Sequence, residues 1–303
     1  MSNYRSGFVS IVGRPNAGKS TLINALVGTK VSIVADKPQT TRTTIQGVLT
    51  REQGQAIFID TPGIHQANTA INKRMMDAVR HALEDRDLLI FIADGTRKPG
   101  ADDRDAVDLL RRVETPAILA LNKIDTIKDK SQMLPVMEAY AALHPFRELL
   151  PIAALTGEGV PELEAVIFPL LPEGPQYFPA DHITDQPERF LAAELIREKI
   201  LLETRQEVPH SVTVMIDSWE DAPEITRVAA TIYVEREGQK GIIIGSRGVM
   251  LKQIGTAARG EMESLLGRRF YLNLHVKVRP KWRESPTFLN TLDWRTMAGS
   301  DDT

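Results

Sequence analysis

The stretch Gly13-Arg14-Pro15-Asn16-Ala17-Gly18-Lys19-Ser20 decides the fold, because it follows a short apolar run at 8–13 and opens a helical pattern at 20–28. It fits GxxxxGK[ST], a loop whose glycines let backbone N–H groups surround phosphates at the positive end of a helix dipole. In this pattern the lysine reaches the β- and γ-phosphates and the hydroxyl binds Mg²⁺. A glycine-rich turn is the alternative, and the strand–loop–helix context argues against it. The predicted nucleotide-binding residues of this loop are Gly13, Arg14, Pro15, Asn16, Ala17, Gly18, Lys19, Ser20 and Thr21, with Lys19 also catalytic.

Short apolar runs surround this loop in the first half of the chain. They lie at 8–13, 56–60, 88–93, 117–122 and 149–153. A weaker run near Val48 is typical of an antiparallel edge strand. Nearly continuous apolar runs separated by amphipathic stretches predict an α/β domain, with a mostly parallel sheet covered by helices on both faces. Ligands bind such sheets outside the carboxyl ends of the strands.

A first polar motif, Asp60-Thr61-Pro62-Gly63, closes the run at 56–60. An aspartate at a strand end is able to hold Mg²⁺ through water, and the Gly63 N–H is placed to contact the γ-phosphate. Alone, DxxG is usually a turn; about forty residues after the phosphate loop it becomes informative. We therefore predict that all four residues bind the nucleotide and that Gly63 acts in catalysis.

A second polar motif, Asn122-Lys123-Ile124-Asp125, closes the run at 117–122 and predicts the base. The Asp125 carboxylate is able to accept hydrogen bonds from the N1–H and the N2 amine of guanine. Adenine offers neither donor, and an unpaired buried carboxylate is penalised. Asn122 would support the loop and reach base N7, and the aliphatic stem of Lys123 would pack over the ring. The motif predicts binding of GTP through Asn122, Lys123 and Asp125.

Length and composition limit the class of protein. The chain has 303 residues, which is enough for two domains. Its composition, with 42% hydrophobic and 25% charged residues, excludes disordered and fibrous architectures. There is no cysteine, which excludes disulfides and thiolate sites and suits a reducing cytoplasm. The N-terminus lacks the apolar stretch of a signal peptide, and no run approaches the roughly 18 apolar residues of a membrane span. We expect a soluble, cytoplasmic protein.

Basic residues are concentrated in one part of this acidic chain. Residues 236–283 contain eleven Lys and Arg and three Glu, a net charge of +8, whereas the whole chain carries −3 and the remainder therefore −11. A solvated basic face is the simplest interpretation. The concentration within an otherwise acidic protein favours a surface that binds a polyanion.

A Pro-rich segment at 171–187 divides the chain. We predict a first domain at 1–174, a linker at 175–187, a second domain at 188–281 and a tail at 282–303. The second domain has a helical pattern at 189–206, strand patterns at 212–216 and 228–234, a strand-like apolar run at 242–244, a helix at 249–266 and a strand at 270–278. The predicted order is α-β-β-α-α-β, an α+β fold. In the tail, Trp282 and Phe288 would either stack RNA bases or dock on a domain.

The run at 242–244 leads into Gly245-Ser246-Arg247-Gly248, a GxxG pattern inside the basic window. With a helix after it, the pattern resembles the loop by which a type II KH domain clamps a nucleic-acid backbone. Arg247 and Lys252 would supply charge, and Ile244 and Ile254 would line a groove for unstacked bases. A turn between core elements is the alternative. The predicted RNA-binding residues are Ile244, Gly245, Ser246, Arg247, Gly248 and Lys252.

The three nucleotide motifs occur in order, with Gln39-Thr40-Thr41-Arg42-Thr43 between the first and the second. Together with the downstream GSRG, this resembles the TrmE–Era branch of P-loop GTPases over nearly the whole chain. The resemblance implies GTP hydrolysis and a catalytic switch threonine that binds Mg²⁺. By the TTR pattern this threonine is Thr41, with Thr40 as the runner-up, and the implied metal residues are Ser20, Thr41 and, through water, Asp60.

Two further residues follow from the resemblance. Asn16 matches a residue that binds K⁺ in some relatives. The Ser-Ala-x motif of the family is matched imperfectly by Ala153-Ala154-Leu155, in which the hydroxyl is lost. The resemblance implies that the Ala154 N–H binds guanine O6, because a backbone donor survives a change of side chain.

The resemblance also implies a role for the chain. It implies binding near the 3′ end of small-subunit ribosomal RNA and assistance in maturation of the small ribosomal subunit. The implied partners are GTP, GDP, ribosomal RNA and the small subunit, with the chain a monomer that contacts the inner membrane peripherally. Two rival hypotheses are a nucleotide-gated RNA-binding scaffold with negligible hydrolysis and a peripheral membrane GTPase whose basic window binds anionic lipid.

One expected side chain is absent. Ras-like GTPases orient the attacking water with a Gln just after DxxG, and here that place holds Ile64. An isoleucine neither positions water nor carries a proton, so backbone groups, a cation or another switch residue must do so. His65 follows, and we expect no catalytic role for it. The missing Gln motivates the scaffold hypothesis.

Overall fold

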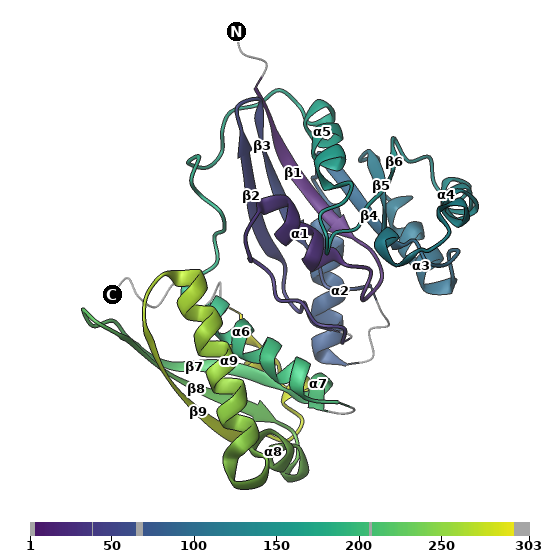
Figure 1. Ribbon diagram of the computed structural model, residues 1–303. Helices are drawn as coiled ribbons and strands as arrows, with labels where there is room; N and C mark the ends of the chain where they lie inside the picture. The colour runs from purple at the N-terminus through teal and green to yellow at the C-terminus, as the bar shows by residue number, and fades with distance from the viewer. Residues whose placement is uncertain (1–3, 38, 65–68, 206–207, 294–303) are drawn as a thin grey trace. The chain divides into compact units, whose positions relative to one another are not determined.

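The protein contains two compact units, each with its own sheet (Figure 1). The computed structural model describes residues 4–37, 39–64, 69–205 and 208–293. The first unit comprises Met1–Ser32, Thr41–Ala67 and Asn72–Asp185, and the second comprises Ile33–Thr40, Asn68–Ile71 and Gln186–Thr303.

The first unit is built on a six-stranded sheet in the order β2-β3-β1-β4-β5-β6. The strands are β1 (Arg5–Val12), β2 (Ile45–Arg51), β3 (Gly54–Asp60), β4 (Leu88–Asp94), β5 (Ala117–Asn122) and β6 (Leu149–Pro151). Five of them run parallel, and β2 pairs antiparallel with β3 at one edge. Every residue of β3, β4 and β5 is buried, which explains their nearly continuous apolar sequences. The predicted sheet and its antiparallel edge strand are confirmed.

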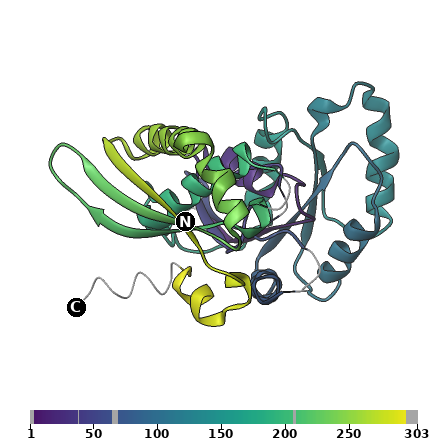
Figure 2. The same cartoon turned by 90° about the horizontal axis from the view of Figure 1, so that it is seen from below.

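Helices cover both faces of this sheet (Figures 1 and 2). They are α1 (Lys19–Val27), α2 (Ala70–Leu83), α3 (Ala101–Leu110), α4 (Met133–Ala141) and α5 (Val160–Leu170), with short 3-10 turns η1 (Ile124–Thr126) and η2 (Lys130–Gln132). On one face, Val79, Val107 and Tyr140 from three helices pack with Phe91 of β4 in a common core. Fully burying such a side chain contributes about 1.5–3 kcal/mol. This packing fixes the strand ends that carry the polar motifs.

The segment predicted as a linker is bound to the first unit over most of its length. The side-chain oxygen of Gln55 accepts hydrogen bonds from the N–H groups of Tyr177 and Phe178, both at 2.9 Å. The Val48 N–H donates to the Ile183 carbonyl at 2.8 Å. The proline-rich composition indicates irregular backbone, but it does not reveal that β2 and β3 supply partners for its polar groups.

The second unit has a three-stranded sheet in the order β7-β8-β9, with an antiparallel β7–β8 pair and a parallel β8–β9 pair. Its elements are α6 (Glu188–Glu203), α7 (Val208–Ser211), β7 (Thr213–Glu220), β8 (Thr226–Val234), α8 (Glu237–Ile244), η3 (Ser246–Gly248), α9 (Val249–Leu266) and β9 (Phe270–Val278). Apart from the one-turn α7, this is the predicted α-β-β-α-α-β order.

The element order is as predicted, but the local conformation predicted for one apolar run is wrong. The apolar run Ile242–Ile244 is the last turn of α8 and not a strand-like segment. The side-chain oxygen of Gln239 accepts hydrogen bonds from the N–H groups of Glu235 and Arg236, at 2.9 and 3.0 Å, and so caps the helix start. Three isoleucines favour a strand locally, but this cap and the burial of Ile243 outweigh that preference.

The tail docks within the second unit, through η4 (Trp282–Glu284) and α10 (Pro286–Thr291). Trp282 is fully buried and its ring N–H donates to the Ser211 carbonyl at 2.9 Å. Phe288 is buried with its ring centroid 5.1 Å from that of Tyr233. Of the two alternatives for these aromatic residues, docking is therefore the one that the structure shows. Nowhere in the described ranges is a helix long and apolar enough to cross a membrane.

Candidate nucleotide site and RNA interface

The phosphate loop connects β1 to α1 and adopts a backbone that glycine must provide. Gly18 has a φ of 107°, and a Cβ there would lie 2.2 Å from the Asn122 side-chain nitrogen. Helix α1 begins directly afterwards at Lys19, so its free N–H groups face the loop. The Lys19 ammonium donates to the carbonyls of Gly13 and Arg14, at 3.1 and 3.0 Å. The loop thus has the form of an anion-binding cradle.

Lys19 is buried, and burial lowers its pKa to about 8, with the Asp60 carboxylate opposing the shift and Arg14 adding to it. For Asp60, burial raises the pKa, whereas Lys19 and three neighbouring hydroxyls oppose the rise. Each charge is therefore held in an environment that disfavours it. A bound polyphosphate with a cation would compensate both.

Three hydroxyl groups converge on the Asp60 carboxylate at the end of β3. Its Oδ2 accepts from Ser20 at 2.7 Å, from Ser32 at 2.8 Å and from Thr41 at 3.3 Å, and the hydroxyls of Ser20 and Thr41 lie 2.8 Å apart. The other oxygen, Oδ1, is buried without a hydrogen-bond partner among the described residues. Hard oxygen donors and an unpaired carboxylate oxygen fit Mg²⁺. No sequence motif identified Ser32.

The two switch threonines differ in their partners. The Thr41 hydroxyl faces Ser20 and Asp60, whereas the Thr40 hydroxyl donates to the carbonyls of Ala35 and Lys37, at 3.2 and 2.7 Å. The geometry therefore supports Thr41, and not Thr40, as the switch residue that binds metal.

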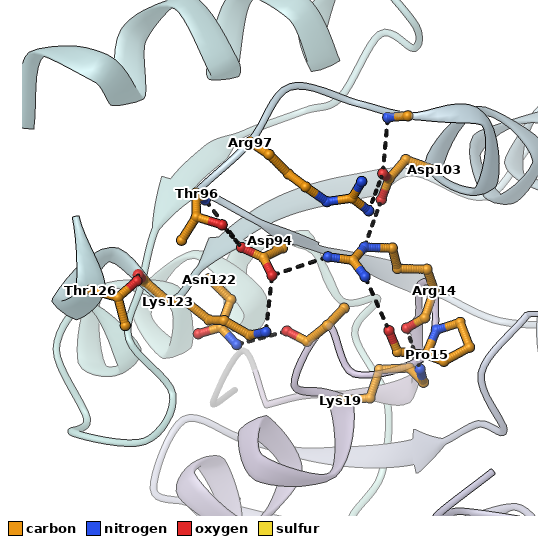
Figure 3. A network of polar contacts seen from close by, with 12 residues as sticks. Arg14, Pro15, Lys19, Asp94, Thr96, Arg97, Asp103, Asn122, Lys123 and Thr126 are labelled. Atoms are coloured by element: carbon orange, nitrogen blue, oxygen red, sulfur yellow. Dashed lines mark hydrogen bonds and ion pairs between the residues drawn. The ribbon is translucent and has the colours of Figure 1, made fainter. Parts of the chain in front are cut away.

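Asn122 links three loops at the end of β5. Its amide nitrogen donates to the Ala17 carbonyl at 2.8 Å, and its oxygen accepts from the Ala154 N–H at 2.9 Å. Lys123 has a φ of 69° and its ammonium binds Asp94 at 2.9 Å (Figure 3). Asp125 lies in the 3-10 turn that follows and is exposed, where its carboxylate is accessible to a base.

The Ala154 N–H differs from expectation. The resemblance implies that it binds guanine O6, but in the structure it already donates to the Asn122 side chain. The reason is that the loop at 153–155 folds against the base loop at 122–125. The buried Ala154 N–H then needs a hydrogen-bond acceptor. Binding to guanine O6 stays a prediction and requires this donor to be shared.

The DxxG motif lies against the phosphate loop. A Cβ at Gly63 would lie 2.8 Å from Pro15 Cα, so only glycine allows this approach. The Thr61 hydroxyl donates to the Ile11 carbonyl at 2.8 Å. Ile64 is half-buried against the core of the sheet, which agrees with its apolar character. His65 lies outside the described residues, so its expected lack of a catalytic role stays a prediction.

The GxxG loop of the second unit joins α8 to α9. Gly245, Arg247 and Gly248 have φ values of 69°, 52° and 79°, a backbone that turns sharply and leaves Ser246 and Arg247 exposed. A Cβ at Gly245 would lie 2.7 Å from Met250 Cβ. Lys252 is exposed on the first turn of α9. Small residues and exposed cations at a helix N-terminus suit contact with a phosphate backbone.

One predicted groove residue is buried, and two exposed apolar residues beside the GxxG loop were not predicted. Ile254 is fully buried in the core of the second unit and is therefore inaccessible to RNA bases. Ile244 is half-buried, whereas Ile242 and Val249, on either side of the loop, are 51% and 55% exposed. A helical pattern over 237–244 would have predicted which of these isoleucines are buried and which are exposed. The strand-like interpretation of the run did not make this distinction.

The chain is a P-loop GTPase with a C-terminal KH domain. Residues 8–123 match the family model described as "50S ribosome-binding GTPase", and residues 207–283 match the KH domain model. It is 49% identical over 288 residues to GTPase Era of Syntrophus aciditrophicus, covering 94% of each chain. It is 47% identical over 293 residues to GTPase Era of Geobacter metallireducens, covering 96% of this chain and 98% of that one. The chain belongs to the Era family, hydrolyses GTP and binds RNA.

Two solved structures are similar over 96% of this chain and 99% of theirs. One is an Aquifex aeolicus Era variant bound to GDP and AlF₄⁻, with 41% identity and a TM-score of 0.92. The other is Era with MgGDPNP and nucleotides 1506–1542 of 16S ribosomal RNA, with 40% identity and a TM-score of 0.93.

Proposed function

We propose that this chain is a GTP-controlled switch that binds the 3′ region of small-subunit ribosomal RNA and assists maturation of the small ribosomal subunit. The similar Era structure with nucleotides 1506–1542 of 16S ribosomal RNA supports this RNA as the partner. The exposed GxxG loop and the +8 charge of residues 236–283 support binding of a nucleic-acid backbone.

The main observation in support of the proposed switch is the position of the residues just before Thr41. Segment 33–40 belongs to the second unit, whereas Thr41, the proposed metal ligand, belongs to the first. The guanidinium of Arg197 on α6 donates to the carbonyls of Gln39 and Thr40, and Glu194 binds it at 2.6 Å. Arg197 is only 1% exposed, so this contact is shielded from water.

A second contact holds the start of the same segment. The Glu198 carboxylate on α6 accepts from the Val34 N–H at 2.7 Å, and Ile33 is buried in the core of the second unit. Lys199, the next residue, binds both Glu198 and Glu261 of α9, the helix that follows the GxxG loop. A continuous set of contacts therefore links segment 33–40 to α6 and to α9.

This arrangement gives a physical route from nucleotide to RNA. Thr41 must face Ser20 and Asp60 to complete the metal site, while Arg197 holds the carbonyl of the adjacent Thr40. Any change in Thr41 on nucleotide exchange acts on the residues bound to α6. We infer that nucleotide state biases how the second unit presents its RNA-binding loop.

We infer that Ser20 and Thr41, with Asp60 through water, hold Mg²⁺, which would neutralise charge on the β- and γ-phosphate oxygens. Asn16, with a φ of 60° in the phosphate loop, is the residue that we propose for K⁺. Lys19 and the N–H groups of the loop bind the phosphates, and the Gly63 N–H faces the γ-phosphate. We further propose a cytoplasmic monomer that contacts the inner membrane peripherally.

The test of RNA choice uses an oligonucleotide of the 3′ region and a scrambled control of equal length and charge. We expect the 3′ sequence to bind the full-length protein more tightly. Replacing Gly245 and Gly248 by Asp should abolish RNA binding and leave GDP binding unchanged, because bulk and negative charge enter only the GxxG loop. Equal affinity for both oligonucleotides would refute the proposed RNA. Flotation with anionic liposomes separates lipid binding from RNA binding.

A further inference from the structure

One acidic side chain lies between the two loops that are proposed to bind nucleotide. Asp94 ends β4 and is opposite Asn122 in the parallel register of β4 and β5. Its side chain is 10% exposed and lies between the phosphate loop at 13–20 and the base loop at 122–125 (Figure 3). None of the nucleotide motifs includes this residue.

A single carboxylate oxygen of Asp94 binds a cation from each loop. Its Oδ2 accepts from the Arg14 guanidinium at 3.0 Å and from the Lys123 ammonium at 2.9 Å, which places the two cationic nitrogens at most about 6 Å apart. Its Oδ1 accepts from the Thr96 N–H at 3.1 Å and from the Thr96 hydroxyl at 2.6 Å. The carboxylate is thereby fixed in orientation and both of its oxygens are paired.

The two cations differ in what else holds them. Asp103 of α3 also pairs with Arg14, at 3.3 Å, and is itself held by Arg97 and the Gly100 N–H. For Lys123, Asp94 is the ion-pair partner that the described part of the chain provides. Lys123 is 37% exposed, so an unpaired ammonium would turn into solvent. Loss of the Asp94 charge would therefore release Lys123 and leave Arg14 bound.

We propose that Asp94 is a positioning residue of the nucleotide site: it holds the Lys123 side chain beside the base and ties the base loop to the phosphate loop. The inference rests on the proposed nucleotide site and adds a residue to it. Burial acts to raise the pKa of Asp94, but hydrogen bonds from Thr96 and Lys123 lower it overall, so the group is charged at neutral pH.

The test uses the full-length protein and the variants Asp94→Asn, Lys123→Gln and the double variant. We expect Asp94→Asn to raise the dissociation rate of fluorescent GDP about tenfold, because the variant loses a hydrogen-bonded charge pair. Because Asp94 acts through Lys123, the double variant should dissociate GDP little faster than the faster single variant. Rates that multiply in the double variant would overturn the proposal.

A second readout separates positioning from a general structural role. Inorganic pyrophosphate, measured by competition, has no base to contact the base loop, so Asp94→Asn should leave its affinity within about twofold of the parent. Equal losses for pyrophosphate and GDP would overturn the proposal. The matched control is Asp108→Asn, which removes an exposed carboxylate paired with Arg111 at 2.8 Å and should change neither affinity.

A third variant keeps the test valid where Asp94→Asn fails to fold. Thr96→Val retains every charge and removes the hydroxyl that orients the carboxylate, so it should raise the GDP dissociation rate about threefold. An unchanged rate in a folded Thr96→Val protein would overturn the proposal. Failure of the parent and of Asp108→Asn to bind GDP would instead refute the nucleotide site itself.

Discussion

At the scale of single residues, burial determines how the nucleotide site handles charge. Lys19 and Asp60 are both buried, and burial acts against the charged form of each. Among the described residues, the hydrogen-bond partners of the Lys19 ammonium are two backbone carbonyls, and one Asp60 oxygen has no partner. Phosphate and metal would complete these groups, so the free site is polar but incompletely paired.

A prediction follows for the pH dependence of nucleotide binding. In the nucleotide-free protein the pKa of Lys19 is about 8, and a bound polyphosphate raises it, so above about pH 8 binding takes up a proton. Affinity for GDP should then fall by up to about tenfold per pH unit above that point. Calorimetry at about pH 9 in two buffers of different ionisation enthalpy measures the proton. No uptake at that pH would contradict the assignment.

A second prediction at this scale concerns the base. Asp125→Asn should weaken GTP binding about a hundredfold and favour xanthosine nucleotides, because the amide offers a donor where xanthine has a carbonyl. Titration with labelled GTP and XTP measures both. The control is Asp129→Asn, which lies in the same exposed segment and keeps the cap of η2. Unchanged GTP affinity in the Asp125 variant would refute guanine recognition by this residue.

At the scale of elements, helix α6 explains how a segment of the nucleotide-binding half becomes part of the other unit. Consecutive residues of α6, Arg197 and Glu198, bind the backbone at the two ends of segment 33–40. The apolar spacing of this helix predicted its formation, but not these two buried charges. A charged residue on a predicted helix is expected to be exposed, and only the fold shows its partner.

The prediction for this element is Arg197→Met, which preserves length and removes the donors to segment 33–40. RNA and nucleotide should each still bind, but the ratio of RNA affinities in the GTP-analogue and GDP states should approach one. RNA binding in both states is the measurement, with circular dichroism to confirm folding. Arg51→Met, which breaks an exposed Arg–Glu pair at 2.6 Å in the first unit, is the control and should keep the ratio. A parental ratio in Arg197→Met would refute the proposed route.

At the scale of the whole molecule, the local sequence pattern predicts some features of the fold and the site, whereas others depend on tertiary contacts. The buried strands and the phosphate loop were predictable because their residues are contiguous and their spacing carries the chemistry. Ser32 and Asp94 were not, because each is an ordinary polar residue until the fold places it beside Asp60 or Lys123. Ile254 was misassigned because its spacing fits a groove and a core equally well.

The last prediction joins the two units. If nucleotide state biases the RNA-binding loop, RNA of the 3′ region should bind more tightly with a non-hydrolysable GTP analogue than with GDP. Linkage then requires the same RNA to tighten binding of the analogue relative to GDP by an identical factor, typically about 5–150-fold. RNA titrations in each nucleotide state and nucleotide titrations with and without RNA give the two factors independently. Equal RNA affinities in both states would show two independent modules on one chain, because a nucleotide that does not distinguish two arrangements has no effect on their populations.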